Sequence, residues 1–493
     1  MSEPELYYPF RLISALNLIE TLYPEEFRSG SIMKQARAAV FSQLDRYSGY
    51  VEPEELSRLQ EEFTGSYGGI GITITGHDRG LAVMSVREGG PADRVGIKTG
   101  DIIIRIDDLT IAGLNNSRAG YLLRGKEGSP VKVVVARNDF TDTLRFDLIR
   151  ENLKLIHIPY AGLTENNSLY IRILDFEAGL SEQLKDILDS SYETNKAKIN
   201  SLILDVRGNP GGLLHEAIEV CDLFLDKGHL IVGVKGRSRW NSREYFSTEN
   251  DVFNGLPLVI LVDRGSASAA EILSGALKYS GRAILVGDTT YGKGLVQEYD
   301  YLSDGSGIRL TTARYYFEGN IYLNDPDADN VDSSVGIPPD YYINSIEYEP
   351  FPMKLESSQL MRAFAVKHQQ EILALAPFSQ PPPKWFNQFV DYAKHEHFEF
   401  QSELTSVAKF IRDEVVFHNY SEAAFKTIDN ICRLAEDDDQ RQFENYQDYI
   451  KQRLYQLATE STFGRARAYR DAIVPYRPEI FLAEKILAGE VPD

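Results

Sequence analysis

A serine and a lysine stand directly after two predicted buried strands, and together they could perform nucleophilic catalysis. The apolar run at residues 258–262 leads through glycine and small residues into an amphipathic helix that begins near Ser268. A second apolar run, at residues 283–286, precedes Lys293, which lies between two glycines. A serine hydroxyl is a weak nucleophile until a base removes its proton, and a lysine is such a base only when burial keeps it neutral. Strand–turn–helix segments present nucleophilic serines in this way; the alternative for Lys293 is an ordinary loop lysine.

The region around both residues has the alternating pattern of an α/β layer. Strand-like and helix-like runs follow one another between residues 151 and 349. The strand-like runs are 202–206, 258–262 and 283–286, and the helix-like runs are 213–225 and 268–279. We therefore predict an α/β fold in which Ser268 and Lys293 belong to one active site.

Residues 65–150 have the pattern of a separate β-rich domain. Glycine-rich turns separate short apolar runs at 70–74, 82–86, 102–106 and 131–136, and residues 89–101 predict a short helix, a turn and a strand. The stretch Gly68, Gly69, Ile70 and Gly71 could let several N–H groups converge on an anion, because glycine permits unusual backbone conformations. A plain glycine-rich hairpin is the alternative.

Predicted helical regions flank these two domains. Within residues 1–64, apolar side chains recur at helical spacing from Leu12 to Leu22. Within residues 350–493, glycine becomes scarce, three prolines at 381–383 interrupt the chain, and residues 405–417 and 446–461 have helical periodicity. Neither region carries a recognisable catalytic motif.

These segments together resemble the C-terminal processing peptidases, also called tail-specific proteases, which are serine peptidases that use a Ser/Lys dyad. The resemblance covers roughly residues 40 to 345. It rests on six segments: LDRYSGYVEPEE at 44–55, YGGIGI at 67–72, DVRGNPGG at 205–212, SASAAE at 266–271, GKGLVQ at 292–297 and GIPPD at 336–340. Ala270 stands where many members of the family have serine.

The resemblance implies a ClpP/crotonase-like protease core with an inserted PDZ domain, and it assigns the catalytic roles. The nucleophile of the family motif corresponds to Ser268 rather than to Ser266, and the base corresponds to Lys293. Gln297 would form a hydrogen bond that orients Lys293, from which it is one turn away if this segment is helical.

An oxyanion hole requires two convergent N–H groups near the nucleophile. The start of a helix favours developing negative charge, and the residue after the nucleophile, Ala269, would supply one N–H group. Either Gly211 or Gly212 would supply the other, because glycine lets the backbone approach a substrate closely. The alternative for this segment is a plain loop between a strand and a helix.

A PDZ domain adds a peptide to a sheet edge and holds its terminal carboxylate with backbone N–H groups. The resemblance therefore implies that Gly68, Gly69, Ile70 and Gly71 bind the C-terminus of a substrate. It also assigns Arg124 as a link between the PDZ domain and the protease core, with a solvated turn cation as the alternative.

We predict a serine endopeptidase that captures exposed protein C-termini and cleaves near the tail through an acyl-enzyme, without a metal or organic cofactor. One alternative is a non-catalytic PDZ-containing peptide-binding scaffold on the same fold. Another is a crotonase-type acyl-CoA enzyme, against which the PDZ-like insert and the Ser/Lys pair argue. The C-terminal helices are a candidate surface for a homo-oligomer or an adaptor complex.

Several features exclude other classes of function. The net charge of −21 argues against nucleic acid or an anionic membrane as a partner, and no apolar stretch is long enough to span a membrane.

The resemblance implies a periplasmic or cell-envelope protein. Because the N-terminus lacks a signal-peptide pattern, we expect that an export signal was removed, with an intracellular protein as the alternative. Some residues imitate metal, disulfide or catalytic sites, but we expect them to be structural or solvated. They are Cys221, Cys432, His215, the pair His395 and His397, and the acidic segment 325–330.

Overall fold

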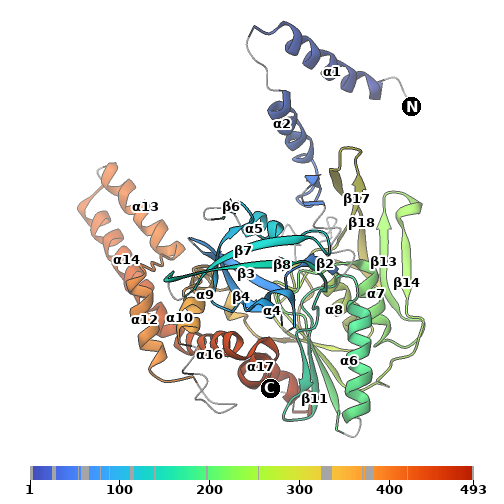
Figure 1. Ribbon diagram of the computed structural model, residues 1–493, viewed down its shortest axis with the longest axis vertical. Coiled ribbons are helices and arrows are strands. Elements are labelled where there is room, and N and C mark those ends of the chain that lie inside the picture. Colours follow the sequence, from blue (N-terminus) through green and yellow to red (C-terminus); the bar gives the residue numbers. More distant parts are fainter. Residues whose placement is uncertain are drawn as a thin grey trace. The chain divides into compact units, whose positions relative to one another are not determined.

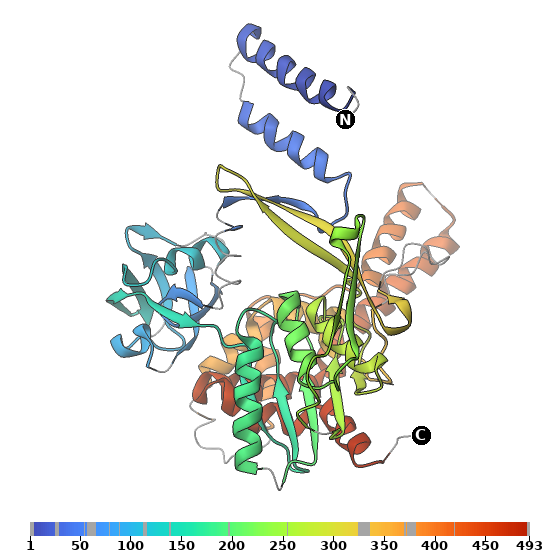
Figure 2. The same cartoon turned by 90° about the vertical axis from the view of Figure 1, so that its right-hand side faces the viewer.

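The computed structural model describes residues 4–24, 29–53, 55–56, 66–77, 79–87, 89–111, 116–137, 140–195, 198–253, 255–323, 336–368, 371, 381–418 and 420–490 (Figures 1 and 2). The chain divides into two compact units. The smaller one comprises residues 1–61, 233–244 and 294–316, and the larger one comprises residues 62–232, 245–293 and 317–493. The acidic segment 325–330 lies outside the described residues.

The larger unit contains the predicted α/β layer, a six-stranded sheet with the strand order β10-β11-β12-β15-β16-β20. The strands are β10 (Tyr160–Leu163), β11 (Ser168–Arg172), β12 (Ser201–Asp205), β15 (Leu258–Val262), β16 (Ile284–Gly287) and β20 (Tyr341–Tyr342). All neighbours are parallel except β10, which is antiparallel to β11. Every residue of β12 and β15 is buried, as expected for a parallel sheet that is covered on both faces.

Helices follow the parallel strands and connect them. The helix α6 (Leu180–Asn195) follows β11, α7 (Leu214–Asp222) follows β12, and α8 (Ala269–Tyr279) follows β15. The C-terminal helix α18 (Pro478–Leu487) packs on one face of the sheet, where its Ile480 and Ala483 contact Ile203, Val259 and Leu261. The predicted α/β fold is therefore confirmed, and α8 begins directly after Ser268.

The PDZ-like domain has its own antiparallel sheet and its own apolar core. The sheet runs in the order β3 (Ile72–His77), β4 (Gly80–Val86), β5 (Ile102–Ile106), β7 (Pro130–Arg137) and β8 (Asp142–Ile149), and β6 (Leu109–Thr110) pairs with β5. Two helices, α4 (Pro91–Val95) and α5 (Asn116–Leu123), belong to this domain. A separate two-stranded ribbon of β2 (Ser66–Gly69) and β9 (Glu151–Lys154) marks where the chain enters and leaves it.

The C-terminal region is helical, as its periodicity predicts. Its aromatic core contains Phe351, Phe364, Trp385 and Phe389. The helices are α9 (Pro350–Ser357), α10 (Leu360–Lys367), α12 (Trp385–His395), α13 (Glu403–Phe417), α14 (Glu422–Gln440), α15 (Gln442–Asn445), α16 (Gln447–Phe463) and α17 (Arg465–Ala468). Short turns η3 (Ile346–Tyr348), η4 (Tyr469–Ile473) and η5 (Val474–Tyr476) complete it, and α13 and α14 lie side by side as a hairpin (Figure 1).

The smaller unit consists of two N-terminal helices and part of a second sheet. The helices are α1 (Pro4–Leu22) and α2 (Ser29–Phe41), and the sheet order is β1-β18-β13-β14, with β17 and β19 paired to β18. The bounds are β1 (Gly49–Val51), β13 (Leu230–Gly236), η1 (Arg239–Asn241), β14 (Arg243–Phe246), β17 (Leu295–Tyr301), β18 (Gly307–Phe317), η2 (Glu318–Asn320) and β19 (Ile321–Tyr322). No helix among the described residues of the chain is long and apolar enough to cross a membrane.

Candidate active site

Ser268 occupies the N-terminal cap of α8 and has a strained backbone. Its φ and ψ angles are 55° and −113°, a positive φ that is uncommon for a residue with a side chain. Ser266, two residues earlier, is fully buried, and its hydroxyl donates to the carbonyl of Val206 at 2.8 Å. The N–H group of Asp263 donates to the same Ser266 oxygen at 3.0 Å. Ser266 therefore holds the turn together, which leaves Ser268 as the better candidate nucleophile of the two.

Glu271, in the first turn of α8, joins the serine segment to the lysine segment. Its Oε2 accepts the N–H groups of Ser268 and Lys293, each at 2.8 Å. Its Oε1 accepts the N–H group of Gly292 and the hydroxyl of Thr290, each at 2.6 Å. The side chain is fully buried; burial raises the pKa of the Glu271 carboxyl, and the four donors oppose that rise. One carboxylate thus fixes the main chain at both members of the predicted dyad.

The loop that carries Lys293 is held by two neighbouring loops. The N–H group of Tyr291 donates to the Ser266 carbonyl at 2.9 Å. Thr290 and Ile337 form two hydrogen bonds. The Ile337 N–H group donates to the Thr290 hydroxyl at 2.7 Å, and the Thr290 N–H group donates to the Ile337 carbonyl at 3.1 Å. A Cβ atom at Gly336 would lie 2.0 Å from the Thr290 carbonyl oxygen, so the GIPPD segment needs glycine there. Lys293 itself is partly buried.

The Gly211–Gly212 turn lies directly against Ser268, the predicted nucleophile. A Cβ atom at Gly211 would lie 2.7 Å from the Cβ atom of Ser268. However, the Gly211 N–H group donates to the side-chain oxygen of the buried Asn209 at 2.8 Å. Among the described residues, no hydrogen bond engages the N–H groups of Gly212 or Ala269. Of the two glycines, Gly212 is therefore the better placed to complete an oxyanion hole with Ala269.

Asp263 connects this glycine turn to the turn that precedes Ser268. Its Oδ1 accepts the N–H group of Gly208 at 2.7 Å and that of Gly265 at 2.9 Å. In addition, the Ala267 N–H group donates to the Asn209 carbonyl at 2.9 Å. Burial raises the pKa of the Asp263 carboxyl, although its two backbone donors act in the opposite direction. Hydrogen bonds to the buried Asp263 side chain and the Asn209 main chain therefore hold the glycine turn and the turn before Ser268 together, in addition to packing.

Gln297 lies in the strand β17, not in a helix. A register irregularity between Val296 and Gln297 interrupts the pairing of β17 with β18. Its Nε2 donates to the hydroxyl of Thr311 on β18 at 3.3 Å. The conditional expectation of one helical turn between Lys293 and Gln297 is therefore wrong. The orienting role of Gln297 stays a prediction.

The predicted tail-binding stretch begins within the β2–β9 ribbon and continues beyond it. Gly68 and Gly69 pair with Asn152 and Glu151 of β9. Gly68 also has a packing reason to be glycine, because a Cβ atom there would lie 1.8 Å from the carbonyl oxygen of Gly125. Gly71 has a φ of 78°, a conformation that favours glycine.

Ile70 of the predicted tail-binding stretch and the predicted link residue Arg124 both contact neighbouring parts of the PDZ-like domain and its ribbon. Ile70 is buried, and its carbonyl accepts the N–H group of Ala92 at the start of α4 at 2.9 Å. The guanidinium of Arg124 lies 4.7 Å from the centroid of the Tyr67 ring. Tyr67 directly precedes Gly68 in the chain. Tail binding and the link through Arg124 both stay predictions.

The described residues that imitate other sites occupy exposed or buried structural positions. His215 is exposed on α7, with its Nε2 3.9 Å from the carboxylate of Glu216. His395 and His397 are exposed, whereas both cysteines, Cys221 and Cys432, are buried. Among the described residues, no group of three or more His, Cys, Asp or Glu side chains could hold a metal ion.

Comparisons with known proteins agree with this architecture. The model of "Peptidase family S41" matches residues 167–343, that of "PDZ domain" matches 68–148, and that of "Probable PDZ-protease, C-terminal helical domain" matches 352–487. The carboxy-terminal-processing protease of Bartonella bacilliformis is 32% identical over 327 residues, which cover 66% of this chain and 71% of that protein. The chain belongs to the carboxy-terminal processing proteases of peptidase family S41. The family predicted from the sequence, a family of serine-type peptidases, is confirmed.

Other carboxy-terminal processing proteases are also similar. CtpA of Bacillus subtilis is 34% identical over 306 residues, which cover 62% of this chain and 64% of CtpA. The chain therefore spans slightly less than two thirds of that relative. The solved structure of a photosystem II D1 C-terminal processing protease is 28% identical with a TM-score of 0.39, and the match covers 69% of this chain and 88% of that one.

Glu271 belongs to the SASAAE segment, but the sequence did not predict its role or the roles of the Asn209 and Asp263 side chains. A local signal for Glu271 existed, because Ser268 and Glu271 have the serine-x-x-glutamate spacing of a helix capping box. No comparable signal marks Asn209 or Asp263, whose partners come from other loops. These three residues position the main chain of the site.

Proposed function

We propose that this chain is a serine endopeptidase that captures exposed protein C-termini through its PDZ domain and cleaves near the tail with a Ser268/Lys293 dyad. The observation that carries the proposal is the buried Glu271 carboxylate, which accepts the N–H groups of both residues at 2.8 Å. A scaffold without catalysis would not require one carboxylate to fix a serine and a lysine from separate loops.

The reaction divides into acylation and deacylation. Neutral Lys293 takes the proton from the Ser268 hydroxyl while the oxygen attacks the substrate carbonyl carbon. The N–H groups of Ala269 and Gly212 stabilise the oxyanion. The protonated Lys293 then donates to the leaving amine, and a water molecule, activated by the same lysine, hydrolyses the acyl-enzyme. In acylation Lys293 carries the proton of Ser268 to the leaving amine, and in deacylation it carries a proton from the water to the oxygen of Ser268.

The proposed substrates are unfolded or tagged proteins with a free, apolar C-terminus. The PDZ domain supports capture of such tails, because a sheet edge with a carboxylate loop recognises both the extended main chain and the terminal charge. The stretch Gly68, Gly69, Ile70 and Gly71 is the proposed carboxylate loop. Amidation of a substrate tail is therefore expected to weaken its capture.

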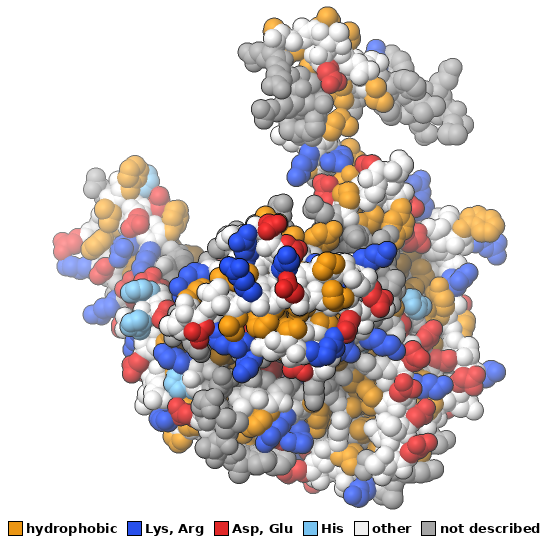
Figure 3. Space-filling model, viewed as in Figure 1, with side chains coloured by type: hydrophobic (Ala, Val, Ile, Leu, Met, Phe, Trp, Pro, Cys, Tyr) orange, Lys and Arg blue, Asp and Glu red, His pale blue; other side chains and the backbone are white. Residues whose placement is uncertain are grey.

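The C-terminal hairpin α13–α14 is the proposed contact for a second copy or an adaptor. Its exposed apolar side chains include Phe410, Phe417 and Leu434, which are 66%, 78% and 53% exposed. On the face seen in Figure 3, apolar side chains lie among charges of both signs. By relationship to bacterial and chloroplast relatives, we also propose a cell-envelope or periplasmic location.

The test is degradation of an unfolded reporter that ends either in a free apolar tail or in the same tail amidated. We expect the wild-type protein to cleave the free-tailed reporter faster, and Ser268→Ala and Lys293→Ala to abolish cleavage, with non-additive losses in the double variant. Peptide binding should survive in both variants. If Ser268→Ala still cleaved the reporter, the catalytic assignment would be wrong. If no variant or wild-type protein cleaved it but all bound the tail, the peptide-binding scaffold would be the correct interpretation.

A further inference from the structure

The segment that leaves the PDZ domain, residues 155–158, is anchored to the protease core through its main chain. The N–H groups of His157 and Ile158 both donate to the side-chain oxygen of Gln183 on α6, at 3.2 Å and 2.9 Å. The carbonyl of His157 accepts the N–H group of Leu174 at 2.8 Å. The exit of the PDZ domain is therefore fixed to two separate elements of the core.

The His157 side chain adds a third anchor. It is 3% exposed, and its Nδ1 lies 2.5 Å from Oδ1 of Asp175. The same Asp175 oxygen accepts the N–H group of Glu177 at 3.3 Å. Burial disfavours the imidazolium, but the hydrogen bond and the charge of Asp175, with a smaller effect of Glu177, outweigh it, so the pKa of His157 is raised.

The anchored segment continues directly into the oxyanion turn. Phe176, the neighbour of Asp175, is fully buried, and its N–H group donates to the Gly211 carbonyl at 2.9 Å. Its own carbonyl accepts the N–H group of Leu213 at 2.7 Å. Gly211 in turn approaches Ser268 so closely that an added Cβ atom would lie 2.7 Å from the serine Cβ atom. An unbroken series of contacts thus runs from the PDZ exit to the nucleophile.

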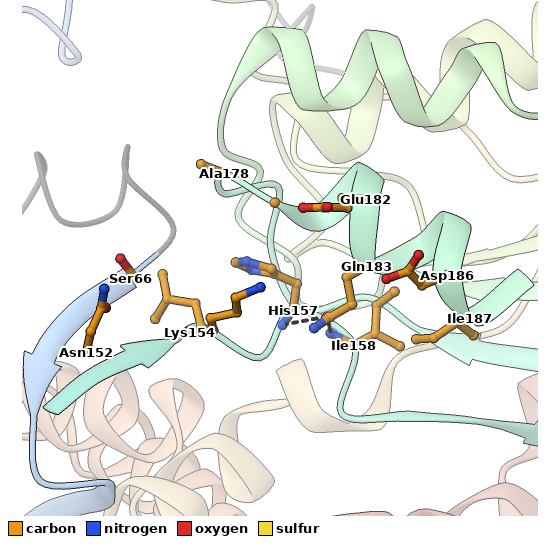
Figure 4. Close-up of a pocket in the computed structure, with 12 residues that line it drawn as sticks. Ser66, Asn152, Lys154, His157, Ile158, Ala178, Glu182, Gln183, Asp186 and Ile187 are labelled. Carbon is orange, nitrogen blue, oxygen red and sulfur yellow. Dashed lines mark hydrogen bonds between the residues drawn. The ribbon is translucent and has the colours of Figure 1, made fainter. Parts of the chain in front are cut away.

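A cavity lies beside His157, between the β2–β9 ribbon and α6 (Figure 4). Its volume is about 560 Å³. The ribbon contributes Ser66, Asn152 and Lys154 to its lining, and α6 contributes Glu182, Gln183 and Asp186. The cavity separates the β2–β9 ribbon from α6, so the ribbon has space to move there. The main chain at His157 and Ile158, in contrast, is held by Gln183.

We propose that His157 is a positioning residue that couples the PDZ domain to the oxyanion turn through its contact with Asp175. The proposal rests on the proposed function, since it presumes acylation of Ser268 and a tail-binding PDZ domain. A tail peptide that favours one position of the β2–β9 ribbon would favour one position of the exit segment. Through the His157–Asp175 contact, a change in that segment would shift Phe176 and the Gly211–Gly212 turn. A ligand can shift such an equilibrium only through its different affinities for the two states.

The experiment measures acylation of Ser268 by a p-nitrophenyl ester, with and without a tail peptide that carries a free carboxylate. The serine oxygen attacks the ester carbonyl, p-nitrophenolate leaves, and Lys293 accepts the serine proton. The readout is the ratio of the two rates, after subtraction of the Ser268→Ala background. Coupling between two sites is typically about 5-fold to 150-fold, so we expect the peptide to raise the wild-type rate at least about 5-fold.

Two variants interrupt the contact in different ways. His157→Gln keeps a hydrogen-bond donor but cannot carry a charge, and Asp175→Asn keeps the shape of the acceptor but not its charge. We expect the ratio to fall close to one in both variants, with the affinity for the tail peptide changed less than about 2-fold and the melting temperature within a few degrees of the wild type. The matched control is Glu182→Gln, which removes a charge from the same cavity without touching the pair. Its ratio should equal that of the wild type.

The pH profile of the ratio separates coupling from a purely structural role. Because the pKa of His157 is raised, the charged pair is present at low pH and is lost as the pH rises through that pKa. The charged groups that act on His157 are Asp175 and Glu177, and Lys154, Glu182 and Asp186 line the cavity beside it. An effect of Lys293 that is the same with and without the peptide cancels in the ratio. We expect the wild-type ratio to fall as the pH rises, and the His157→Gln ratio to stay flat.

The outcomes distinguish this proposal from the proposed function. A wild-type ratio of one, or wild-type ratios in both His157→Gln and Asp175→Asn, would overturn the coupling while leaving the peptidase intact. Absence of any acylation of wild-type Ser268 would overturn the proposed function itself, and the coupling with it. A loss of the ratio in Glu182→Gln as well would show that general charge in the cavity, not the His157–Asp175 contact, is responsible.

Discussion

Replacing Glu271 by glutamine tests how the dyad is positioned. The substitution keeps the size of the side chain but turns one acceptor oxygen into an NH2 group. All four partners of Glu271 are donors: the N–H groups of Ser268 and Lys293 on one oxygen, and the N–H group of Gly292 and the hydroxyl of Thr290 on the other. In either orientation of the amide, two donors therefore lose their acceptor and face another donor.

The expected cost of Glu271→Gln follows from these contacts. An unsatisfied buried donor costs about 1–3 kcal/mol, so the two orphaned donors should lower the free energy of unfolding by roughly 2–6 kcal/mol. Relief of this conflict requires one of the two loops to move away from the other. A displacement of about 1 Å at a reacting group costs on the order of 100-fold in rate. We expect kcat to fall by about that factor, with little change in KM for a tailed peptide.

The matched control is Glu216→Gln. Glu216 is also buried, and its two oxygens accept the N–H groups of Gly179 and Ser181 at 2.7 Å and 2.8 Å. Both variants should lose stability in urea unfolding, but only Glu271→Gln should lose about 100-fold in kcat. If the two variants lost the same factor in kcat, or if Glu271→Gln stayed within about 3-fold of the wild type, the reasoning would be refuted.

Three further perturbations follow from the geometry. In Gly212→Ala the added Cβ atom would lie 2.4 Å from the Phe176 carbonyl oxygen; displacement of the turn should remove an oxyanion donor and lower kcat about 100-fold to 1000-fold in a burst assay, and a wild-type burst would exclude Gly212 from the oxyanion hole. Arg124→Ala should slow turnover of long tailed substrates while the affinity for a tail peptide changes less, and unchanged turnover would leave the PDZ domain as a passive tether. Arg477 lowers the pKa of the partly buried Glu347 from 4.5 to about 2, so the stability from this pair is present above pH 4.5 and is lost as the pH falls toward 2. Arg477→Met should flatten the dependence of unfolding free energy on pH in that window, and an unchanged slope would contradict this assignment.

The sequence predicted those parts of the structure that are encoded locally. Continuous apolar runs predicted β12 and β15, since a parallel strand buried on both faces needs no polar alternation. Glycine-rich motifs predicted the turns around the site because close approach of backbone excludes a Cβ atom, as at Gly211. The family and its α/β fold were predicted from several such segments that occur together.

Features that depend on distant partners could not be predicted. Gln297 lies in a strand because β17 pairs with β18, and pairing across such a hairpin overrides the local pattern of the chain. Glu271 gains its role from donors on a different loop, of which only the capping box was visible in the sequence. Gly211 and Gly212 look alike in the sequence, and only the contact with Asn209 distinguishes them.

The most direct test of the central claim is to locate the acyl group on the enzyme by mass spectrometry after reaction with the p-nitrophenyl ester and rapid acid quench. We expect a single acylated peptide that carries the modification on Ser268, and no such peptide from Lys293→Ala under the same conditions. Modification of Ser266 or of any other residue in place of Ser268, or equal modification of Ser268 in the wild type and in Lys293→Ala, would contradict the Ser268/Lys293 dyad.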